Sequence, residues 1–379
     1  MRVGIVAAEP SGDRLAAGLM AELSRRRPDI RFEGIGGAAM QAQGLEPLHP
    51  MEQLSVMGLV EVLKHLPGLL ALRRDLVRRW SREPPDLFIG VDAPDFNLAL
   101  ERAMKRQGVP TVHYVSPTVW AWREGRTRKL RQAADRVLCI FPFEKPFLEE
   151  RGVGAEYVGH PLASAYPLEP DREAARGKLG LDPQRPVLAL LPGSRVNEVQ
   201  QLASPFLDAA CRLHGRIEGL QVATPVATPR TGELFREIVA ARAPELPLQL
   251  HPGATAEVLA AADAALVASG TATFEALLSK CPMVVGYRMN PLTYRIITGL
   301  GMLKTEHVAM ANLLCREPLA PEFLQEACTG ENLAGALGNY FEDPELTAQV
   351  RKVYGETHRE LVMDTDALAA NAVLELVEG

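Results

Sequence analysis

The sequence lacks the long apolar run that a membrane-spanning helix needs. No stretch of about 18 or more consecutive apolar residues occurs anywhere in its 379 residues, which excludes a transmembrane helix. The first residues carry one positive charge and a short apolar run, followed by Glu9 and Asp13, so we expect no signal peptide. An apolar fraction of 47% and a charged fraction of 23% are typical of a globular chain.

Cysteine is scarce and positive charge is not in excess. The five cysteines are odd in number and no two form a C-x-x-C pair, which disfavours a zinc or redox motif and suits a reducing cytoplasm. Lys+Arg 41 against Asp+Glu 47 gives a net charge of −6, so a nucleic-acid partner is not expected. No P-loop lysine is present, and phosphoryl transfer from ATP is therefore not indicated.

Short apolar strands alternate with helical stretches in two series. The first series runs from Val3–Ala8 to Glu156–Gly159, and the second follows a proline-rich join and runs from Val187–Leu191 to Met283–Tyr287. This rhythm predicts an α/β fold of two doubly wound domains with mainly parallel sheets. We place the domains at residues 1–165 and 170–342. Because such folds bind ligands beyond the carboxyl ends of their strands, the residues that follow each strand are the candidate site.

Acidic residues follow two strands of the first domain. Ser11 or Asp13 could cap the helix after the first strand, and a substrate contact by Asp13 is equally open. For Glu9 we favour a functional role. Asp92 and Asp95 follow a later strand, where a carboxylate can take a proton from an attacking hydroxyl. Asp95 could instead cap the next helix, but Asp92 lies too early to do so.

The loop after the next strand holds two of the three tryptophans of the chain. Trp120 and Trp122 either pack against the protein or contact a ligand, because a pair of exposed indole rings is costly. His113 lies within the strand itself, which favours a core or supporting role over catalysis.

Two turns in the second domain are suited to an anion. Ser194 and Arg195 follow a strand and a glycine, and a helix N-terminus with an adjacent guanidinium suits a diphosphate. The alternative is Ser194 as a helix cap with Arg195 in solvent. A second Ser-Gly-Thr turn precedes Glu275, whose carboxylate could accept both hydroxyls of a ribose, although a plain capping motif would look the same. The candidate nucleotide-binding residues are Ser194, Arg195, Gly253, Ser269, Gly270, Thr271, Thr273 and Glu275.

Residues 58–80 combine many leucines with positive charge. Five basic and two acidic residues give this segment a net charge of +3, and Pro67-Gly68 predicts a break into two pieces. A basic amphipathic helix of this kind can lie in a membrane interface. The residues alone favour a core helix with a solvated basic face.

A series of short motifs spans the chain in a fixed order. They are AEPSGD (8–13), MEQLSVMGLVEVL (51–63), DLFIGVDAPDFN (86–97), VHYVSPTVWAWR (112–123), FPFEK (141–145), VGHPL (158–162), LLPGSR (190–195), ASGTATFEAL (268–277), CPMVVGYR (281–288) and NLL (312–314). Together they resemble the lipid-A-disaccharide synthase family.

This resemblance implies a fold and a reaction. The fold would be GT-B-like, with two Rossmann-like domains facing across a cleft and the C-terminal residues 343–379 able to return to the first domain. The reaction would transfer 2,3-diacylglucosamine from UDP-2,3-diacylglucosamine to 2,3-diacylglucosamine 1-phosphate. Its products would be the β-1,6-linked disaccharide 1-phosphate and UDP, with inversion at the anomeric carbon.

The resemblance also assigns roles to residues. Asp92 becomes the preferred base, Glu9 and Asn312 match positions linked to activity, and the two anion-competent turns become the UDP site with Glu275 on the ribose. Residues expected on the acceptor side or in support of it are Ser11, Asp13, Asp95, His113 and Trp120. No metal and no cofactor are expected, because no Asp-x-Asp pair lies in the nucleotide-binding half.

For residues 58–80 the resemblance favours the interfacial interpretation. The membrane-facing side chains would be Val60, Leu63, Leu66, Leu69, Leu70 and Leu72. We then expect a peripheral protein at the cytoplasmic face of the inner membrane, with its oligomeric state left open. Rival interpretations are another UDP-sugar enzyme of the same fold, such as a peptidoglycan-type glycosyltransferase or a UDP-sugar epimerase, and a non-catalytic UDP-binding membrane adaptor.

Overall fold

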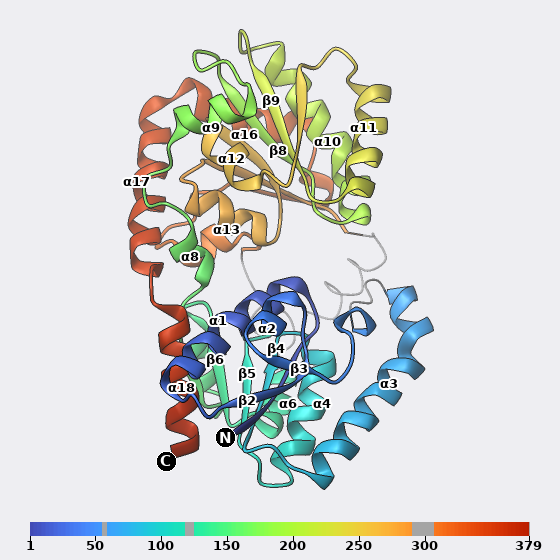
Figure 1. The fold of residues 1–379 in the computed structure, drawn as a ribbon. Helices are drawn as coiled ribbons and strands as arrows, with labels where there is room; N and C mark the ends of the chain where they lie inside the picture. Colours follow the sequence, from blue (N-terminus) through green and yellow to red (C-terminus); the bar gives the residue numbers. More distant parts are fainter. Residues whose placement is uncertain (55–58, 118–124, 290–306, 379) are drawn as a thin grey trace. The chain divides into compact units, whose positions relative to one another are not determined.

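The chain folds into two compact units (Figure 1). The computed structural model describes residues 1–54, 59–117, 125–289 and 307–378, without the side chains of 59–65 and 125–126. Unit 1 comprises residues 1–161 and 363–379, and unit 2 comprises residues 162–362. Of the C-terminal stretch 343–379, only the part from residue 363 onward therefore belongs to unit 1.

Unit 1 is built on a seven-stranded parallel sheet with the order β3-β2-β1-β4-β5-β6-β7. The strands are buried along almost their whole length because helices cover both faces of the sheet. The order of connection reverses between β1 and β4, which are paired neighbours. The strands are β1 (Arg2–Ala7), β2 (Arg31–Ile35), β3 (Leu45–Pro47), β4 (Leu87–Val91), β5 (Thr111–Tyr114), β6 (Arg136–Cys139) and β7 (Ala155–Tyr157).

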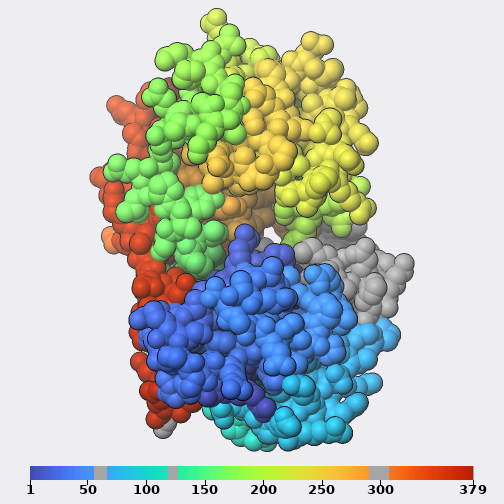
Figure 2. All heavy atoms as spheres, viewed as in Figure 1, coloured from blue at the N-terminus to red at the C-terminus, as the bar shows by residue number. Residues whose placement is uncertain are grey.

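Among the described residues, two large hydrophobic cores and a smaller cluster around β6, α6 and α7 fill the space between this sheet and its helices. One core packs the sheet against the first and last long helices of the chain, α1 and α18. The other packs it against α3 and α4, with Leu76 and Trp80 completely buried. Figure 2 shows the red C-terminal residues lying beside the blue N-terminal ones in this unit. The helices are α1 (Pro10–Arg26), α2 (Ala38–Ala42), α3 (Leu59–Arg82), α4 (Pro94–Lys105), α6 (Gly125–Ala133), α7 (Glu144–Glu149) and α18 (Thr365–Glu378), with a short 3-10 helix, η1 (Met51–Gln53).

Unit 2 repeats the design on a six-stranded parallel sheet with the order β10-β9-β8-β11-β12-β13. Its reversal lies between β8 and β11. The strands are β8 (Val187–Leu191), β9 (Gln221–Val226), β10 (Leu248–Pro252), β11 (Ala264–Ala268), β12 (Met283–Tyr287) and β13 (Glu322–Leu324). The helices are α8 (Pro161–Ala165), α9 (Arg172–Leu179), α10 (Val196–His214), α11 (Pro229–Arg242), α12 (Thr255–Ala261), α13 (Thr271–Leu278), α15 (Met310–Leu314), η2 (Gln325–Ala327), α16 (Gly330–Glu342) and α17 (Pro344–Leu361).

One expected break in the first domain is absent. Pro67 lies inside α3, which continues through it as a single helix to Arg82 (Figure 1). A proline removes one backbone donor and bends a helix, but it does not have to end one when packing holds both sides. The prediction of two separate pieces was wrong.

Candidate active site

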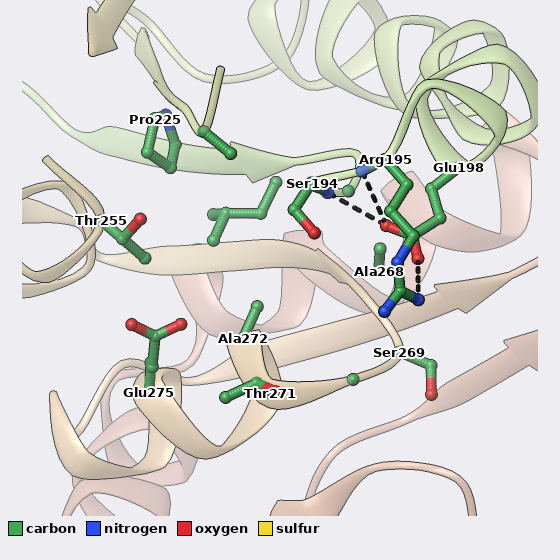
Figure 3. A pocket seen from close by; sticks show the side chains of 14 residues that line it. Ser194, Arg195, Glu198, Pro225, Thr255, Ala268, Ser269, Thr271, Ala272 and Glu275 are labelled. Carbon is green, nitrogen blue, oxygen red and sulfur yellow. Dashed lines mark hydrogen bonds and ion pairs between the residues drawn. The ribbon is translucent and has the colours of Figure 1, made fainter. Parts of the chain in front are cut away.

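A polar pocket lies at the reversal point of the unit 2 sheet. It encloses about 260 Å³ and is formed by the turns that follow β8 and β11 (Figure 3). In open parallel sheets this is where ligands bind. The lining residues are Leu191, Gly193, Ser194, Arg195, Glu198, Pro225, Ala227, Thr255, Ala268, Ser269, Gly270, Thr271, Ala272 and Glu275.

The turn after β8 already holds a carboxylate. Glu198 Oε2 accepts the backbone N–H groups of Ser194 at 3.0 Å and Arg195 at 3.2 Å, and its other oxygen lies 3.2 Å from the Arg195 guanidinium (Figure 3). Gly193 makes this possible, because a Cβ there would lie 2.4 Å from that of Glu198. Arg195, rather than Ser194, is the N-cap of α10, and Glu198 completes its capping box. The anion site expected here is thus filled by the protein's own side chain.

The turn after β11 has a partner that the sequence did not reveal. The Tyr166 hydroxyl, just beyond α8, donates to Glu275 Oε1 at 2.9 Å. Burial raises the pKa of Glu275, and this hydrogen bond lowers it in part. The two residues are 109 positions apart, and Tyr166 belongs to no motif, so only the folded chain identifies it.

Two predicted nucleotide-binding residues do not line this pocket. Thr273 is completely buried; its hydroxyl donates to the Gly270 carbonyl at 2.8 Å and accepts the Met310 N–H at 2.9 Å. It therefore holds the turn in shape instead of facing a ligand. Gly253 follows β10 but is outside the lining set.

Asn312 is part of a network behind the same turn. Its amide nitrogen donates to Glu322 Oε1 at 2.7 Å and to the Ala320 carbonyl at 2.8 Å, and its oxygen accepts the Ala320 N–H at 2.9 Å. Glu322 also accepts the Val308 N–H at 2.8 Å, and the Val308 carbonyl accepts the Ser269 hydroxyl at 3.0 Å. A chain of hydrogen bonds thus connects Asn312 to the pocket through backbone and side-chain groups.

The reversal point of unit 1 carries acidic residues. Ala7 of β1 pairs with Val91 of β4, so Glu9 and Asp92 leave the sheet at the same place. Both side chains are partly exposed. Asp92 has a φ of 51° and Ala93 one of 44°, a left-handed backbone that non-glycine residues rarely adopt. Such strain is concentrated at functional sites.

Other predicted residues of unit 1 have structural roles. Asp13 is buried and its carboxylate accepts the N–H groups of Gly37 at 2.7 Å, Ala39 at 3.0 Å and Met40 at 3.1 Å. It therefore caps α2 rather than its own helix, and neither it nor exposed Ser11 caps α1, which starts at Glu9 without a side-chain cap.

The remaining acceptor-side predictions have mixed outcomes. Asp95 lies within the first turn of α4, whose N-cap is Ala93, so the prediction of Asp95 as a cap was wrong. His113 is completely buried, with its Nδ1 2.6 Å from a carboxylate oxygen of Glu101. Trp120 lies outside the described residues.

Helix α3 separates its leucines onto two faces. Leu72 is 7% exposed and packs in the core with Leu76 and Trp80, one helical turn apart each, so the prediction that Leu72 faces a membrane was wrong. Leu69 is half-buried against the same core, whereas Leu66 is 41% exposed. Leu70 is partly exposed. The side chains of Val60 and Leu63 lie outside the described ones.

Two other features are absent from the part of the chain that the structure describes. No helix there is long and apolar enough to cross a membrane. No group of three His, Cys, Asp or Glu residues there is placed to hold a metal ion.

Two open parallel sheets, each with polar turns at its reversal point, define the two-domain GT-B fold. Solved structures with this fold include an Anabaena protein in complex with UDP and glucose (TM-score 0.58, 13% identity, covering 100% of this chain and 99% of that one). Another is a UDP-GlcNAc 2-epimerase from Neisseria meningitidis (TM-score 0.59, 12% identity, 99% of each chain). Identities this low establish the fold alone.

The family is identified by sequence. The model of the family described as lipid-A-disaccharide synthetase matches residues 3–376. The lipid-A-disaccharide synthase of Alkalilimnicola ehrlichii is 49% identical over 381 residues, covering 100% of this chain and 99% of that protein. That of Pseudomonas aeruginosa PAO1 is 50% identical over 378 residues, covering 100% and 98%. The chain belongs to the lipid-A-disaccharide synthase family and is a glycosyltransferase of lipid A assembly; the epimerase and adaptor alternatives are not favoured.

Proposed function

We propose that this enzyme transfers 2,3-diacylglucosamine from its UDP donor to 2,3-diacylglucosamine 1-phosphate. The acceptor 6-hydroxyl oxygen attacks the anomeric carbon while the bond from that carbon to the UDP oxygen breaks. The hydroxyl proton passes to a carboxylate of the enzyme, and UDP leaves with the bonding pair. A single displacement inverts the anomeric centre and gives the β-1,6 linkage. The transition state has oxocarbenium character, as in glycoside hydrolysis.

The pocket of unit 2 is the observation that carries the donor assignment. Backbone N–H groups at the start of a 19-residue helix and the 69% exposed Arg195 side chain suit a diphosphate. Glu275 offers a carboxylate to the ribose hydroxyls. Since Glu198 occupies the N–H groups, a diphosphate would exchange with that carboxylate rather than enter an empty site. Arg195 would then stabilise the charge that builds on departing UDP.

Asp92 is the proposed base, with Glu9 as the second candidate at the same reversal point. Asp92 is partly exposed and lies where a parallel sheet presents groups to a ligand. Both hydrogens of the Asn312 amide are donated to Glu322 and the Ala320 carbonyl, so we assign Asn312 a supporting role that acts through Glu322 on the Ser269 turn.

A product assay tests the reaction. Purified protein is mixed in detergent micelles with both diacylglucosamine substrates, and disaccharide 1-phosphate and UDP are followed by mass spectrometry. We expect both products in equal amounts, and no UDP release when the acceptor is left out. UDP release without acceptor would favour an epimerase-type reaction. A folded protein that binds UDP but makes no disaccharide would contradict the proposal.

We further propose that the enzyme works peripherally at the cytoplasmic face of the inner membrane. Both substrates carry acyl chains that partition into a bilayer. Leu66, Leu70, Arg74 and Arg78 follow one another at four-residue intervals on α3, opposite the buried row that includes Leu72. Leucines followed by arginines on one exposed face suit an interface with anionic lipid.

Vesicle binding tests this surface. Leu66→Ser with Leu70→Ser should weaken sedimentation with anionic vesicles and leave thermal unfolding unchanged, since neither residue is in the core. A matched control is Leu168→Ser with Val362→Ser, which removes exposed apolar side chains from unit 2 (44% and 41% exposed). Equal vesicle binding by both double variants would count against α3 as the membrane-facing surface.

A further inference from the structure

The turn that carries Asp92 is held at both of its ends. The Asp92 N–H donates to the Tyr114 carbonyl of β5 at 2.8 Å, and the Asp92 carbonyl accepts from Asn97 Nδ2 at 2.8 Å. Between these anchors the backbone is left-handed at two successive non-glycine residues. Each such residue costs free energy relative to the right-handed form, so the turn persists only where its surroundings fix it.

Asn97 is the main anchor. It lies in the first turns of α4 and is completely buried. Besides Asp92, its Nδ2 reaches the carbonyls of Val91 at 3.2 Å and Val6 at 3.3 Å, so one amide touches both strands at the reversal point. Its own Oδ1 is buried with no hydrogen-bond partner in the described part of the protein. Buried acceptors are almost always paired. In this orientation the Asn97 amide holds the turn through Nδ2, while its Oδ1 is left without a hydrogen bond.

A buried pair lies one helical turn further along α4 from Asn97. Glu101 and His113 are both 0% exposed, and Glu101 Oε1 lies 2.6 Å from His113 Nδ1. His113 is in register with Gly90 of β4. A Cβ on Gly90 would lie 2.1 Å from Glu101 Oε1 and 2.9 Å from Asn97 Cβ, so this glycine lets the polar face of α4 seat directly on the sheet. A buried ionisable pair is a poor source of stability compared with apolar packing.

We infer that Asn97, seated by the Glu101–His113 pair, is a positioning residue that sets the direction of the Asp92 carboxylate by locking the Asp92–Ala93 turn. The inference rests on the proposed role of Asp92 as base. Because the backbone is fixed on both sides of the Asp92 Cα, only the side-chain torsions of Asp92 can still change the direction of its carboxylate. Loss of the anchor lets the turn relax toward the right-handed region and moves the carboxylate away from the acceptor hydroxyl.

Glycine at position 93 provides a selective test, because glycine adopts a left-handed backbone without an anchor. Asn97→Ala should lower kcat by at least about tenfold, since small misplacement of a catalytic group is costly. The donor KM and the Kd of UDP should stay close to wild type. Asn97→Ala combined with Ala93→Gly should recover a large part of the lost kcat. A loss of kcat that came only from unfolding of the protein would appear as a reduced folded fraction of Asn97→Ala at the assay temperature, whereas a relaxed turn leaves the variant folded.

The assay is the disaccharide assay above, with thermal unfolding recorded for each variant. Asn332→Ala, which removes an exposed side-chain hydrogen bond to the Ala327 carbonyl in unit 2, is the matched control and should keep wild-type kcat. Unchanged kcat in Asn97→Ala, or no recovery in the double variant, would overturn the inference alone. Full activity in Asp92→Asn would overturn it together with the assignment of the base, and absence of product from wild type would overturn the proposed function beneath both.

Discussion

The two units share one strand order and place their polar turns at the same point of it, but they build those turns in opposite ways. In unit 2 a glycine, Gly193, supplies the unusual backbone after β8, and the charge that matters comes from an exposed arginine and backbone N–H groups. In unit 1 the turn after β4, on the other side of the reversal point, has no glycine, and Asp92 and Ala93 themselves take the left-handed form under a buried amide.

This difference fits two kinds of task. The diphosphate of the proposed donor would be recognised by N–H donors and positive charge on a turn that gives up its contact with Glu198. A general base needs a fixed carboxylate, and a strained turn held from beneath fixes it more firmly than a flexible one. The comparison yields four predictions, ordered from the largest expected effect to the smallest.

Asp92→Asn should separate chemistry from nucleotide binding. It removes the proposed base in unit 1 and should lower kcat by about 10²–10⁴-fold, the usual contribution of general base catalysis. UDP affinity, measured by calorimetry, should not change because the pocket is in unit 2. If kcat and UDP affinity fell together, the proposed assignment of catalysis to unit 1 and nucleotide binding to unit 2 would be contradicted.

Arg195→Ala should do the reverse. Hydrogen bonds to charged groups contribute about 1.5–3 kcal/mol, so the Kd of UDP should rise by about 10–100-fold. Arg185→Ala is the control, because Arg185 is a 61% exposed arginine of unit 2 outside the pocket, paired with Asp182. Similar UDP affinities for the two variants would argue against a diphosphate at this turn.

Tyr166→Phe should shift the pH dependence of UDP binding. In the proposed complex ionised Glu275 accepts the ribose hydroxyls, so affinity should be lost as pH falls through its pKa. Burial raises the pKa of Glu275 and the Tyr166 hydroxyl lowers it, so removing the hydroxyl should raise that pKa further. The loss of affinity should then occur at higher pH in the variant, and on the acidic side of the profile its Kd for UDP should be several-fold weaker than that of wild type.

The control for this profile is Tyr157→Phe in unit 1, which removes a buried hydroxyl that has no partner among the described residues. Its UDP profile should match that of wild type. Superimposable profiles for wild type and Tyr166→Phe would mean that Glu275 does not contact the ribose.

Opposite changes at the two turns should have opposite effects on stability. Ala93→Gly relieves a left-handed alanine and should raise the free energy of unfolding by about 1 kcal/mol, after the extra freedom of glycine in the unfolded chain is subtracted. Gly193→Ala places a Cβ 2.4 Å from that of Glu198 and should lower it. Urea unfolding of the full chain measures the change in the free energy of unfolding for each variant. Changes of the same sign would contradict the contrast between the two turns.

Much of this arrangement could be predicted from the sequence. Apolar strands followed by Ser194–Arg195 and by Ser269–Glu275 indicated that turns far apart in the chain would meet, and those turns line one pocket. The same logic put Glu9 and Asp92 at strand ends. The alternation of strands and helices along the chain determines at which edge of a parallel sheet each turn lies, and this does not depend on the directions of individual side chains.

The directions of individual side chains could not be predicted in the same way. Thr273 and Asp13 face inward because of the position that each takes around its helix. The Glu198 side chain bends back toward the N-terminus of its own helix, α10. Tyr166 and Glu275 are 109 residues apart, so their contact depends on the tertiary fold of unit 2 and not on any local pattern. For Leu72 a signal did exist, since its spacing of four from Leu76 and eight from Trp80 marks a buried row.

The last helix has a consequence for the order in which the protein is made. Arg26 of α1 donates a hydrogen bond to the Ala367 carbonyl at 3.2 Å, and Arg136 of β6 donates one to the Ala372 carbonyl at 2.7 Å. The ribosome therefore releases all of unit 2 before it releases the segment that completes unit 1. While the rest of the chain is synthesised, the apolar face that α18 will cover stays open, at a stage when nascent proteins are most prone to aggregate and to engage chaperones. Unit 1, whose synthesis begins first, is therefore the unit that is completed last.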